Sequence, residues 1–129
     1  MSLHESAEMY LETIYVLANE LGNVRSIDVA EHMGYSKPSV SRAVGILKRD
    51  GLLLMEKDGS LALTEEGRKA AKKIFERHTT LTEFLKRIGV SKETASDDAC
   101  KIEHVISDET INAMKSFIDN NIDNNIDYK

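Results

Sequence analysis

The sequence predicts a mainly α-helical protein, in which an N-terminal winged helix-turn-helix precedes a second, helical domain. Three observations support this fold class. Long segments with helical apolar periodicity are interrupted by only one proline in 129 residues. Two short apolar runs flank Lys57-Asp58-Gly59, a tripeptide typical of a β-hairpin turn. The hairpin follows two short helical segments, and this order of elements is the plan of a winged helix.

The elements of the first domain can be placed from their caps and breakers. Ser26 is a candidate N-cap for the second helix, and Ser36 for the third, which carries Pro38 in its first turn, where proline is tolerated. Glycines and Asn or Asp residues end each segment. The expected elements are helices over 6–21, 27–33 and 37–49, followed by strands over 52–56 and 60–63.

The second half of the chain is expected to be helical throughout. Thr64 is a candidate N-cap for a helix that runs from Glu65 to about Arg77 or beyond, and a further apolar segment covers 81–88. Ser91 and Ser107 are N-cap candidates for two final helices. These elements predict domains over 1–73 and 74–118 and, because Asn and Asp dominate the end of the chain, a flexible tail over 119–129.

Composition sets limits on the class of protein. Hydrophobic residues make up 41% and charged residues 30% of the chain, which is ordinary for a soluble globular protein. A single cysteine cannot form an intramolecular disulfide, so we expect a cytoplasmic protein. No apolar run approaches the roughly 20 residues that a membrane span needs, and no signal-peptide pattern opens the chain. We therefore expect no membrane partner.

The net charge of −5 hides an asymmetry along the chain. Residues 24–77 hold 11 Lys and Arg against 8 Asp and Glu, whereas the remainder holds 6 against 14. A mildly basic segment beside acidic ones fits a nucleic-acid-binding module joined to a part that binds cations or a second copy of the chain. The excess is modest, so charge alone does not establish DNA binding.

The second helix of the helix-turn-helix is the expected DNA reader. Its first residues are small or cationic, which permits close approach to base edges and phosphates. Arg42 can pair with guanine, while Lys48, Arg49 and the wing residue Lys57 are candidates for phosphate contacts. The alternative is a winged helix that contacts proteins, with solvated basic residues. The predicted DNA-binding residues are Ser36, Lys37, Pro38, Ser39, Ser41, Arg42, Lys48 and Lys57.

A cluster of metal-binding residue types lies near the C-terminal end. Cys100, Glu103 and His104 are spaced i, i+3 and i+4, so on a helix they would share one face and offer sulfur, oxygen and nitrogen to a transition metal. The alternative is a small buried cysteine beside a solvated Glu–His pair. Met9 and Glu12 share a face of the first helix, although a core methionine and a surface acid are the simpler interpretation.

Four segments together resemble one family. Residues 8–15, 36–41, 77–78 and 98–108 look like the iron-dependent repressors, the diphtheria-toxin-repressor family that includes the manganese transport regulators. The resemblance runs from about Ala7 to about Phe117, and its specificity lies in the combined order and spacing. It implies a homodimer with an N-terminal winged helix and a helical dimerisation and metal-binding domain. As in short members, no SH3-like domain is expected.

The resemblance also implies metal ligands. Iron-type members use a Met, a Cys, a Glu and a His, which match Met9, Cys100, Glu103 and His104. Manganese-type members add an acid and a histidine, which match Glu12 and His78, so this chain looks mixed. The ancillary site of iron-type members is doubtful here, because Thr82 and Ser96 occupy two of its positions.

These features lead to one functional expectation with alternatives. We expect a metal-dependent regulator, a repressor of metal-uptake genes, that binds palindromic double-stranded operator DNA as a homodimer when loaded with Fe(II). Mn(II) is the second choice of metal, and Co(II), Ni(II) or Zn(II) would bind in vitro. A metal-blind winged-helix regulator is the runner-up. A metalloenzyme and a small organic substrate are not expected, because the chain has no nucleophile motif or phosphate-binding glycine loop.

Overall fold

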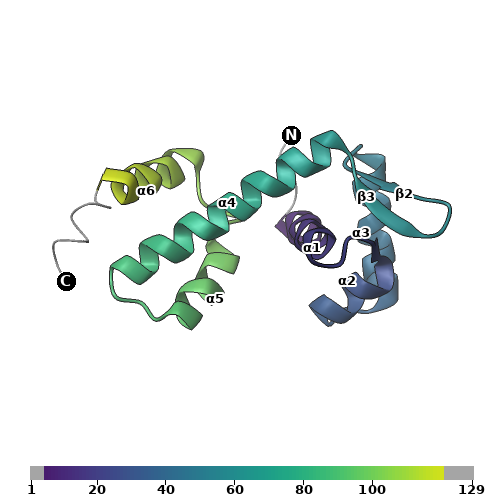
Figure 1. Cartoon of the computed structure of the whole chain (residues 1–129), viewed down its shortest axis with the longest axis horizontal. Coiled ribbons are helices and arrows are strands. Elements are labelled where there is room, and N and C mark those ends of the chain that lie inside the picture. Colours follow the sequence, from purple (N-terminus) through teal and green to yellow (C-terminus); the bar gives the residue numbers. More distant parts are fainter. Residues whose placement is uncertain (1–4, 121–129) are drawn as a thin grey trace. The chain divides into compact units, whose positions relative to one another are not determined.

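The computed structural model describes residues 5–120 of the chain, with the side chain of Glu5 left out (Figure 1). The predicted tail falls mostly outside this range, although 119–120 belong to the last helix. In chain order the elements are α1 (Glu5–Leu21), β1 (Val24–Arg25), α2 (Ser26–Met33), α3 (Lys37–Arg49), β2 (Leu53–Met55), β3 (Ser60–Leu63), α4 (Glu65–Arg87), α5 (Lys92–Ile102) and α6 (Asp108–Asn120). The mainly helical fold class is confirmed.

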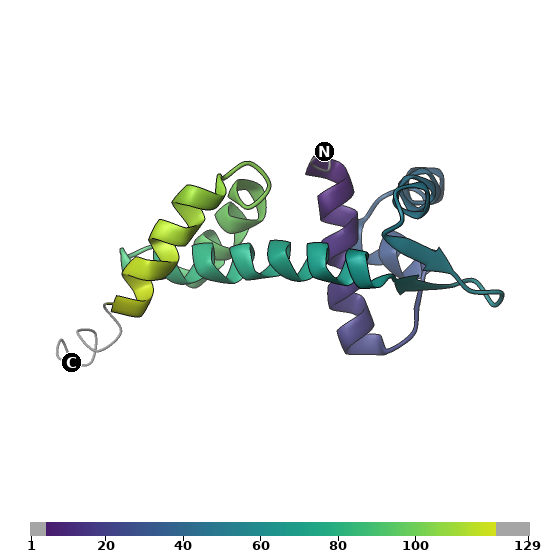
Figure 2. The same cartoon turned by 90° about the horizontal axis from the view of Figure 1, so that it is seen from above.

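The chain divides into two compact units, one up to Lys73 and one from Ile74, and α4 runs through the boundary. In the first unit, α1, α2 and α3 pack on one another and on a three-stranded antiparallel sheet of order β1-β3-β2. Strands β2 and β3 form the predicted hairpin (Figure 2). Leu53 lies opposite Leu63, and Met55 lies opposite Leu61. This arrangement is a winged helix-turn-helix.

Strand β1 was not predicted from the sequence. It consists only of Val24 and Arg25, which pair with Leu61 and Ser60 of β3. Two residues are too few to show the alternation of polar and apolar side chains by which a strand is recognised. The pairing uses backbone groups of the loop between α1 and α2, and it buries Val24 completely.

The core of the first unit explains why these segments are helices and strands. Its largest fully buried side chains come from every layer of the unit: Leu11, Ile14, Val24, Val29, Val40, Leu47 and Leu53. Gly67 of α4 lies against the backbone of Leu52, directly before the hairpin. A Cβ atom there would lie 2.0 Å from the carbonyl oxygen of Leu52, so only glycine lets the helix pass the hairpin.

Most of the predicted helix starts are confirmed. In four of them a hydroxyl oxygen accepts the backbone N–H three residues later at 3.0 to 3.4 Å, and the capping residues are Ser36, Thr64, Ser91 and Ser107. The prediction for Ser26 was wrong, because Ser26 is the first helical residue of α2 and Arg25 is its N-cap. There the Asp28 carboxylate accepts a hydrogen bond from the Arg25 backbone N–H at 2.9 Å. A residue in the first turn of α2 thus bonds the N–H group of the N-cap residue.

The second unit is built around the latter part of α4. Helix α4 continues beyond Arg77, as the sequence allowed, and takes up most of the apolar segment at 81–88, so that it is continuous over 23 residues. Leu81 of α4, Ala99 of α5 and Ile111 of α6 form its core, with Ile102, Ile106 and Met114 packed against them. Phe84 and Phe117 add an edge-to-face contact between α4 and α6, with ring centroids 5.8 Å apart. Helices α5 and α6 therefore lie beside the latter part of α4 (Figure 1 and Figure 2).

Within the described residues, no helix is both long and apolar enough to cross a bilayer.

Candidate functional site

The C-terminal end of α5 holds the predicted metal-binding residues, but the helix stops earlier than expected. It ends at Ile102, and Glu103 occupies its C-cap. The Arg77 guanidinium donates a hydrogen bond to the carbonyl oxygen of Glu103 at 3.2 Å and also pairs with Asp108. The Glu103 carbonyl thus bonds to a side chain of α4 instead of to a backbone N–H in a further turn of α5. The prediction that His104 continues the helical face of Cys100 and Glu103 was therefore wrong.

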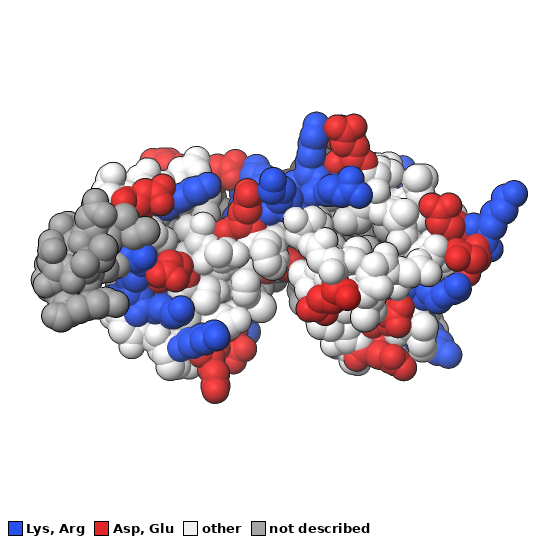
Figure 3. All heavy atoms as spheres, in the orientation of Figure 1, with Lys and Arg blue, Asp and Glu red and all other residues white. Residues whose placement is uncertain are grey.

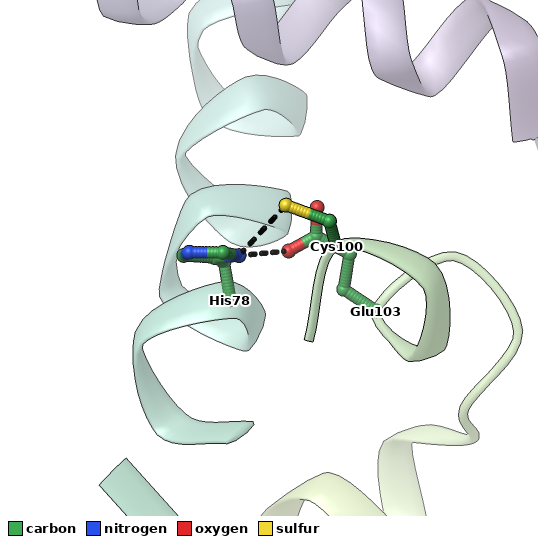
Figure 4. A group of neighbouring side chains, drawn as sticks. All are labelled: His78, Cys100 and Glu103. Carbon is green, nitrogen blue, oxygen red and sulfur yellow. Dashed lines mark hydrogen bonds and ion pairs between the residues drawn. The ribbon is translucent and has the colours of Figure 1, made fainter. Parts of the chain in front are cut away.

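Helix α4 brings a third residue to this point. His78 Nδ1 lies 3.1 Å from Glu103 Oε2 and 3.8 Å from Cys100 Sγ (Figure 4). One ligand atom from each of these side chains lies within 4.8 Å of the others. The three residues will be called the His-Cys-Glu cluster. It offers nitrogen, sulfur and oxygen to a single point, as a divalent transition metal requires.

Glu103 is the unusual member of the cluster, because its side chain is fully buried. His104 Nε2 lies 3.4 Å from Oε1, and His78 approaches Oε2 from the other side. Neither ring is aligned to donate a hydrogen bond, so within the described residues both carboxylate oxygens are left without a donor. A buried carboxylate in this state is costly unless a cation or proton compensates it. The residues present therefore fit a bound metal ion.

A hydroxyl group lies on the far side of the His78 ring. Ser96 Oγ is 3.5 Å from Nε2, while Nδ1 faces Cys100 and Glu103. Partners on the second ring nitrogen commonly fix the orientation and tautomer of a metal-binding histidine. Sequence reasoning treated Ser96 only as a missing histidine. The signal that would have found it is its spacing of four residues from Cys100 on α5.

The remaining predicted ligands, Met9 and Glu12, lie three residues apart on α1 in the first unit, and both are half-buried. Their ligand roles stay predictions. Next to Thr82 on α4, the Glu83 carboxylate accepts a hydrogen bond from Arg87 Nε at 2.8 Å. The doubt about an ancillary site stays a prediction.

The predicted DNA-binding residues lie mostly on the exposed face of α3. Of the eight, seven are exposed and Ser39 is half-buried. The Ser36 hydroxyl accepts the Ser39 backbone N–H and donates to the Ser39 hydroxyl at 2.9 Å, so both serines take part in capping the helix. The opposite face of α3 holds Val40, Val44 and Leu47 in the core. Amphipathic packing thus leaves the small and cationic side chains facing outward.

The wing is held by residues that sequence reasoning did not single out. Arg25 pairs with Asp58 at the hairpin turn, and the Asp58 carboxylate accepts hydrogen bonds from the Ser60 hydroxyl at 2.7 Å and the Ser60 N–H at 3.0 Å. The Ser60 hydroxyl and N–H, together with nearby Arg25, lower the pKa of Asp58 below its usual value. Lys57 is therefore presented from a fixed turn.

Further basic residues follow the hairpin. Arg68, Lys69, Lys72 and Lys73 are exposed on the first part of α4, and Lys69 pairs with Glu65 at 3.8 Å. Figure 3 shows basic side chains gathered over this part of α4 and others at the end of the β2–β3 hairpin. The basic excess of this segment thus lies on the surface of the winged-helix unit.

Near the start of α3, two tyrosine rings meet. The ring centroids of Tyr10 on α1 and Tyr35 before α3 are 5.9 Å apart, at an interplanar angle of 57°. Burial and the neighbouring Tyr35 raise the pKa of Tyr10, and the Arg42 guanidinium partly opposes this rise. Three segments of the first unit thus meet beside the N-terminus of α3.

A winged helix followed by a helical unit with a metal-binding cluster defines the class of metal-responsive DNA-binding regulators. Family models agree with this description. Residues 2–61 match the iron dependent repressor N-terminal DNA binding domain, and residues 64–124 match the iron dependent repressor metal binding and dimerisation domain. The chain belongs to the iron-dependent repressor family, whose members are transcriptional regulators rather than enzymes.

The similar curated proteins include both MntR regulators and a diphtheria toxin repressor. The chain is 38% identical over 113 residues to the HTH-type transcriptional regulator MntR of Bacillus pumilus, covering 88% of this chain and 78% of that protein. It is 38% identical to the transcriptional regulator MntR of Escherichia coli O157:H7, covering 88% and 73%. It is 40% identical over 108 residues to the diphtheria toxin repressor of Corynebacterium jeikeium, covering 83% and 45%.

Solved structures share the fold. The manganese regulator SloR matches with a TM-score of 0.78 and 27% identity, covering 92% of this chain and 55% of that one. A manganese-dependent transcriptional repressor in complex with manganese matches with a TM-score of 0.79 and 30% identity, covering 87% and 52%. This chain thus spans about half the length of these solved chains.

Proposed function

We propose that this protein represses metal-uptake genes by binding palindromic operator DNA as a homodimer when it is loaded with Fe(II). The observation that carries the proposal is the buried Glu103 carboxylate, which has no hydrogen-bond donor in the described residues and lies beside His78 and Cys100. A metal-binding cluster in a chain with a winged helix favours a sensor over a regulator that does not respond to metal.

The donor set supports Fe(II) as the first choice. A thiolate from Cys100 beside an imidazole and a carboxylate suits Fe(II), Co(II), Ni(II) or Zn(II) better than Mn(II). Mn(II) is the second candidate, because the name of the solved repressor quoted above includes manganese and because His78 joins the cluster. Availability in the cell, and not affinity alone, selects the metal.

The residues that would hold the ion are His78, Cys100 and Glu103, with His104 against the second oxygen of Glu103. Bound there, a divalent cation supplies the positive charge that compensates the buried carboxylate and links α4 to the end of α5. Met9 and Glu12 are further proposed donors, on the family resemblance.

Recognition of DNA is assigned to α3, whose first turn would enter the major groove, with Lys48 and Lys57 on phosphates. In a homodimer, two such helices would read half-sites separated by about one helical turn of DNA, roughly 34 Å, or a multiple of it. Metal raises operator affinity only if the DNA-binding form holds the ion more tightly than the other form.

The test is a fluorescence-anisotropy titration of a family-type palindromic operator under anaerobic conditions. Parallel titrations contain chelator, Fe(II), Mn(II) or Zn(II) at one salt concentration, because salt alone changes DNA affinity. Binding that requires metal, and is tightest with Fe(II), is the expected result. Tightest binding with Mn(II) would replace Fe(II) by Mn(II), and equal binding in chelator would establish a regulator that does not respond to metal.

A double substitution tests the assignment of the site. His78→Ala with Cys100→Ala should abolish the metal requirement for binding or the binding itself. The matched control is His32→Ala, because His32 is an exposed histidine on α2 in the other unit and should leave the metal response unchanged. If the double variant responds to metal as the parent does, the His-Cys-Glu cluster is not the regulatory site.

A further inference from the structure

Tyr35 occupies a prominent place on the winged-helix unit. It lies in the turn between α2 and α3, directly before the capping residue Ser36, and its side chain is 45% exposed. The backbone of this turn is held, because the N–H groups of Gly34 and Tyr35 both bond to the carbonyl of Ala30, at 2.9 and 3.2 Å. Gly34 adopts a positive φ of 71°, which suits glycine at a helix C-terminus.

The ring of Tyr35 is held as well as its backbone. It packs against Tyr10, which is only 8% exposed and is therefore anchored in the core of the unit. Tyr10 in turn lies close enough to Arg42 of α3 for the guanidinium charge to act on its hydroxyl. A large exposed ring with a hydroxyl group is thus presented in one orientation beside the predicted reading residues.

We infer that Tyr35 contacts operator DNA, with its hydroxyl donating a hydrogen bond to a phosphate oxygen, and that Tyr10 is the positioning residue that orients it. This inference rests on the proposed binding of double-stranded DNA. Tyrosine hydroxyls and helix N-termini are common phosphate-binding groups in protein–DNA complexes. The N-terminus of α3 carries Lys37 next to the same turn. A ring that is ordered before binding loses less entropy on contact.

The neutral hydroxyl gives this contact a distinctive signature. A lysine or arginine on a phosphate releases counterions, so its loss lowers the dependence of affinity on salt. Loss of a tyrosine hydroxyl weakens binding but leaves that salt dependence unchanged. A phosphate contact is also independent of base sequence. The effect should therefore be equal on operator and random-sequence duplexes.

The experiment measures affinity for both duplexes at several salt concentrations, with the metal-loaded full chain. Tyr35→Phe should bind both about tenfold more weakly than the parent, the usual range for a lost bond to a charged group. Tyr10→Leu should weaken binding several-fold, and adding Tyr35→Phe to it should cost less than a further twofold. Tyr10→Phe keeps the ring and should bind within twofold of the parent.

The matched control is Tyr15→Phe, which removes a hydroxyl from another face of α1 and should leave the affinity for both duplexes unchanged. Circular dichroism melts should show that Tyr35→Phe is folded, and that variant decides the contact even if Tyr10→Leu does not fold. Binding of Tyr35→Phe within twofold of the parent on both duplexes would overturn the inference. Metal-independent binding by the parent would overturn only the proposed function, and a parent that binds neither duplex would overturn both.

Discussion

The two units of this chain bury different kinds of groups. In the winged-helix unit the largest fully buried side chains are aliphatic, whereas the second unit buries the whole carboxylate of Glu103 near a core that includes Leu81, Ala99 and Ile111. Both units expose large apolar side chains, such as Leu21 and Leu54 in the first unit and Ile88 and Val105 in the second. The units therefore differ in the buried Glu103 carboxylate, which has no hydrogen-bond donor among the described residues.

The difference indicates that the two units have different roles. A unit with a satisfied aliphatic core keeps one structure under all conditions, which suits a surface that must match DNA. A unit with a buried carboxylate that has no hydrogen-bond donor gains stability whenever a cation binds, because ligands that bind only the folded form stabilise it. Each prediction below changes one unit and tests this contrast between them.

The largest effect is expected in the aliphatic core. Leu47→Ala removes a fully buried side chain of α3 and should lower the free energy of unfolding of the first unit by about 3 kcal/mol. Denaturant unfolding followed by circular dichroism measures the loss. The control Leu54→Ala, at an exposed position of β2, should change it by less than about 0.5 kcal/mol. Equal losses in both variants would refute the idea of a compact aliphatic core.

The next effect concerns the buried carboxylate. Glu103→Gln should lower metal affinity roughly a hundredfold or more, since losing even a residue that only orients a metal ligand costs about ten- to a hundredfold. In chelator the variant should melt no lower than the parent, because a neutral amide removes the cost of a buried charge. Metal titration and thermal melting measure the two outcomes.

Its matched control is Glu93→Gln, an exposed acid in the first turn of α5. That variant should keep the metal affinity of the parent. If Glu103→Gln keeps the metal affinity but melts lower in chelator, Glu103 is a structural residue and the contrast between the units fails.

A smaller effect is expected from removing one helix cap in each unit, which changes the two units in the same way. Ser36→Ala and Ser91→Ala each remove a hydroxyl that accepts a backbone N–H, and each should cost about 1 kcal/mol of stability. Ser91→Ala should also weaken metal binding, because α5 carries Cys100, whereas Ser36→Ala should not. Denaturant unfolding and metal titration test both, and a loss of metal affinity in Ser36→Ala would contradict the separation of roles.

The smallest effect is expected at the wing and depends on pH. The folded pKa of Asp58 is lowered, first by the Ser60 hydroxyl, so its ionised form is favoured in the folded protein. Its contribution to stability is present above the unfolded carboxyl pKa of about 3.9 and is lost as pH falls through the lower folded value. The urea midpoint of the parent should therefore approach that of Asp58→Asn between pH 6 and pH 3. A constant difference between the two proteins would contradict this.

Much of the fold follows from the sequence, because its signals are local. Ser36, Thr64, Ser91 and Ser107 each compete with water for a backbone N–H only three residues away, so sequence spacing is sufficient to place four helix starts. The hairpin is encoded in the same way by its turn tripeptide. Ser26 failed as a cap because Asp28 and Arg25 satisfy the same groups, and local spacing alone does not rank such competitors.

By itself, then, the sequence determined the winged helix, the helical second unit, and the types of residue that a metal site needs. Only the tertiary structure decided which of them meet. Arg77 ends α5 at Ile102 by bonding to Glu103, and α4 brings His78 to within 3.1 Å of the Glu103 carboxylate from 25 residues earlier in the chain. The reason is physical: helical spacing extends over a few residues, whereas a metal site requires atoms from segments that only packing brings together.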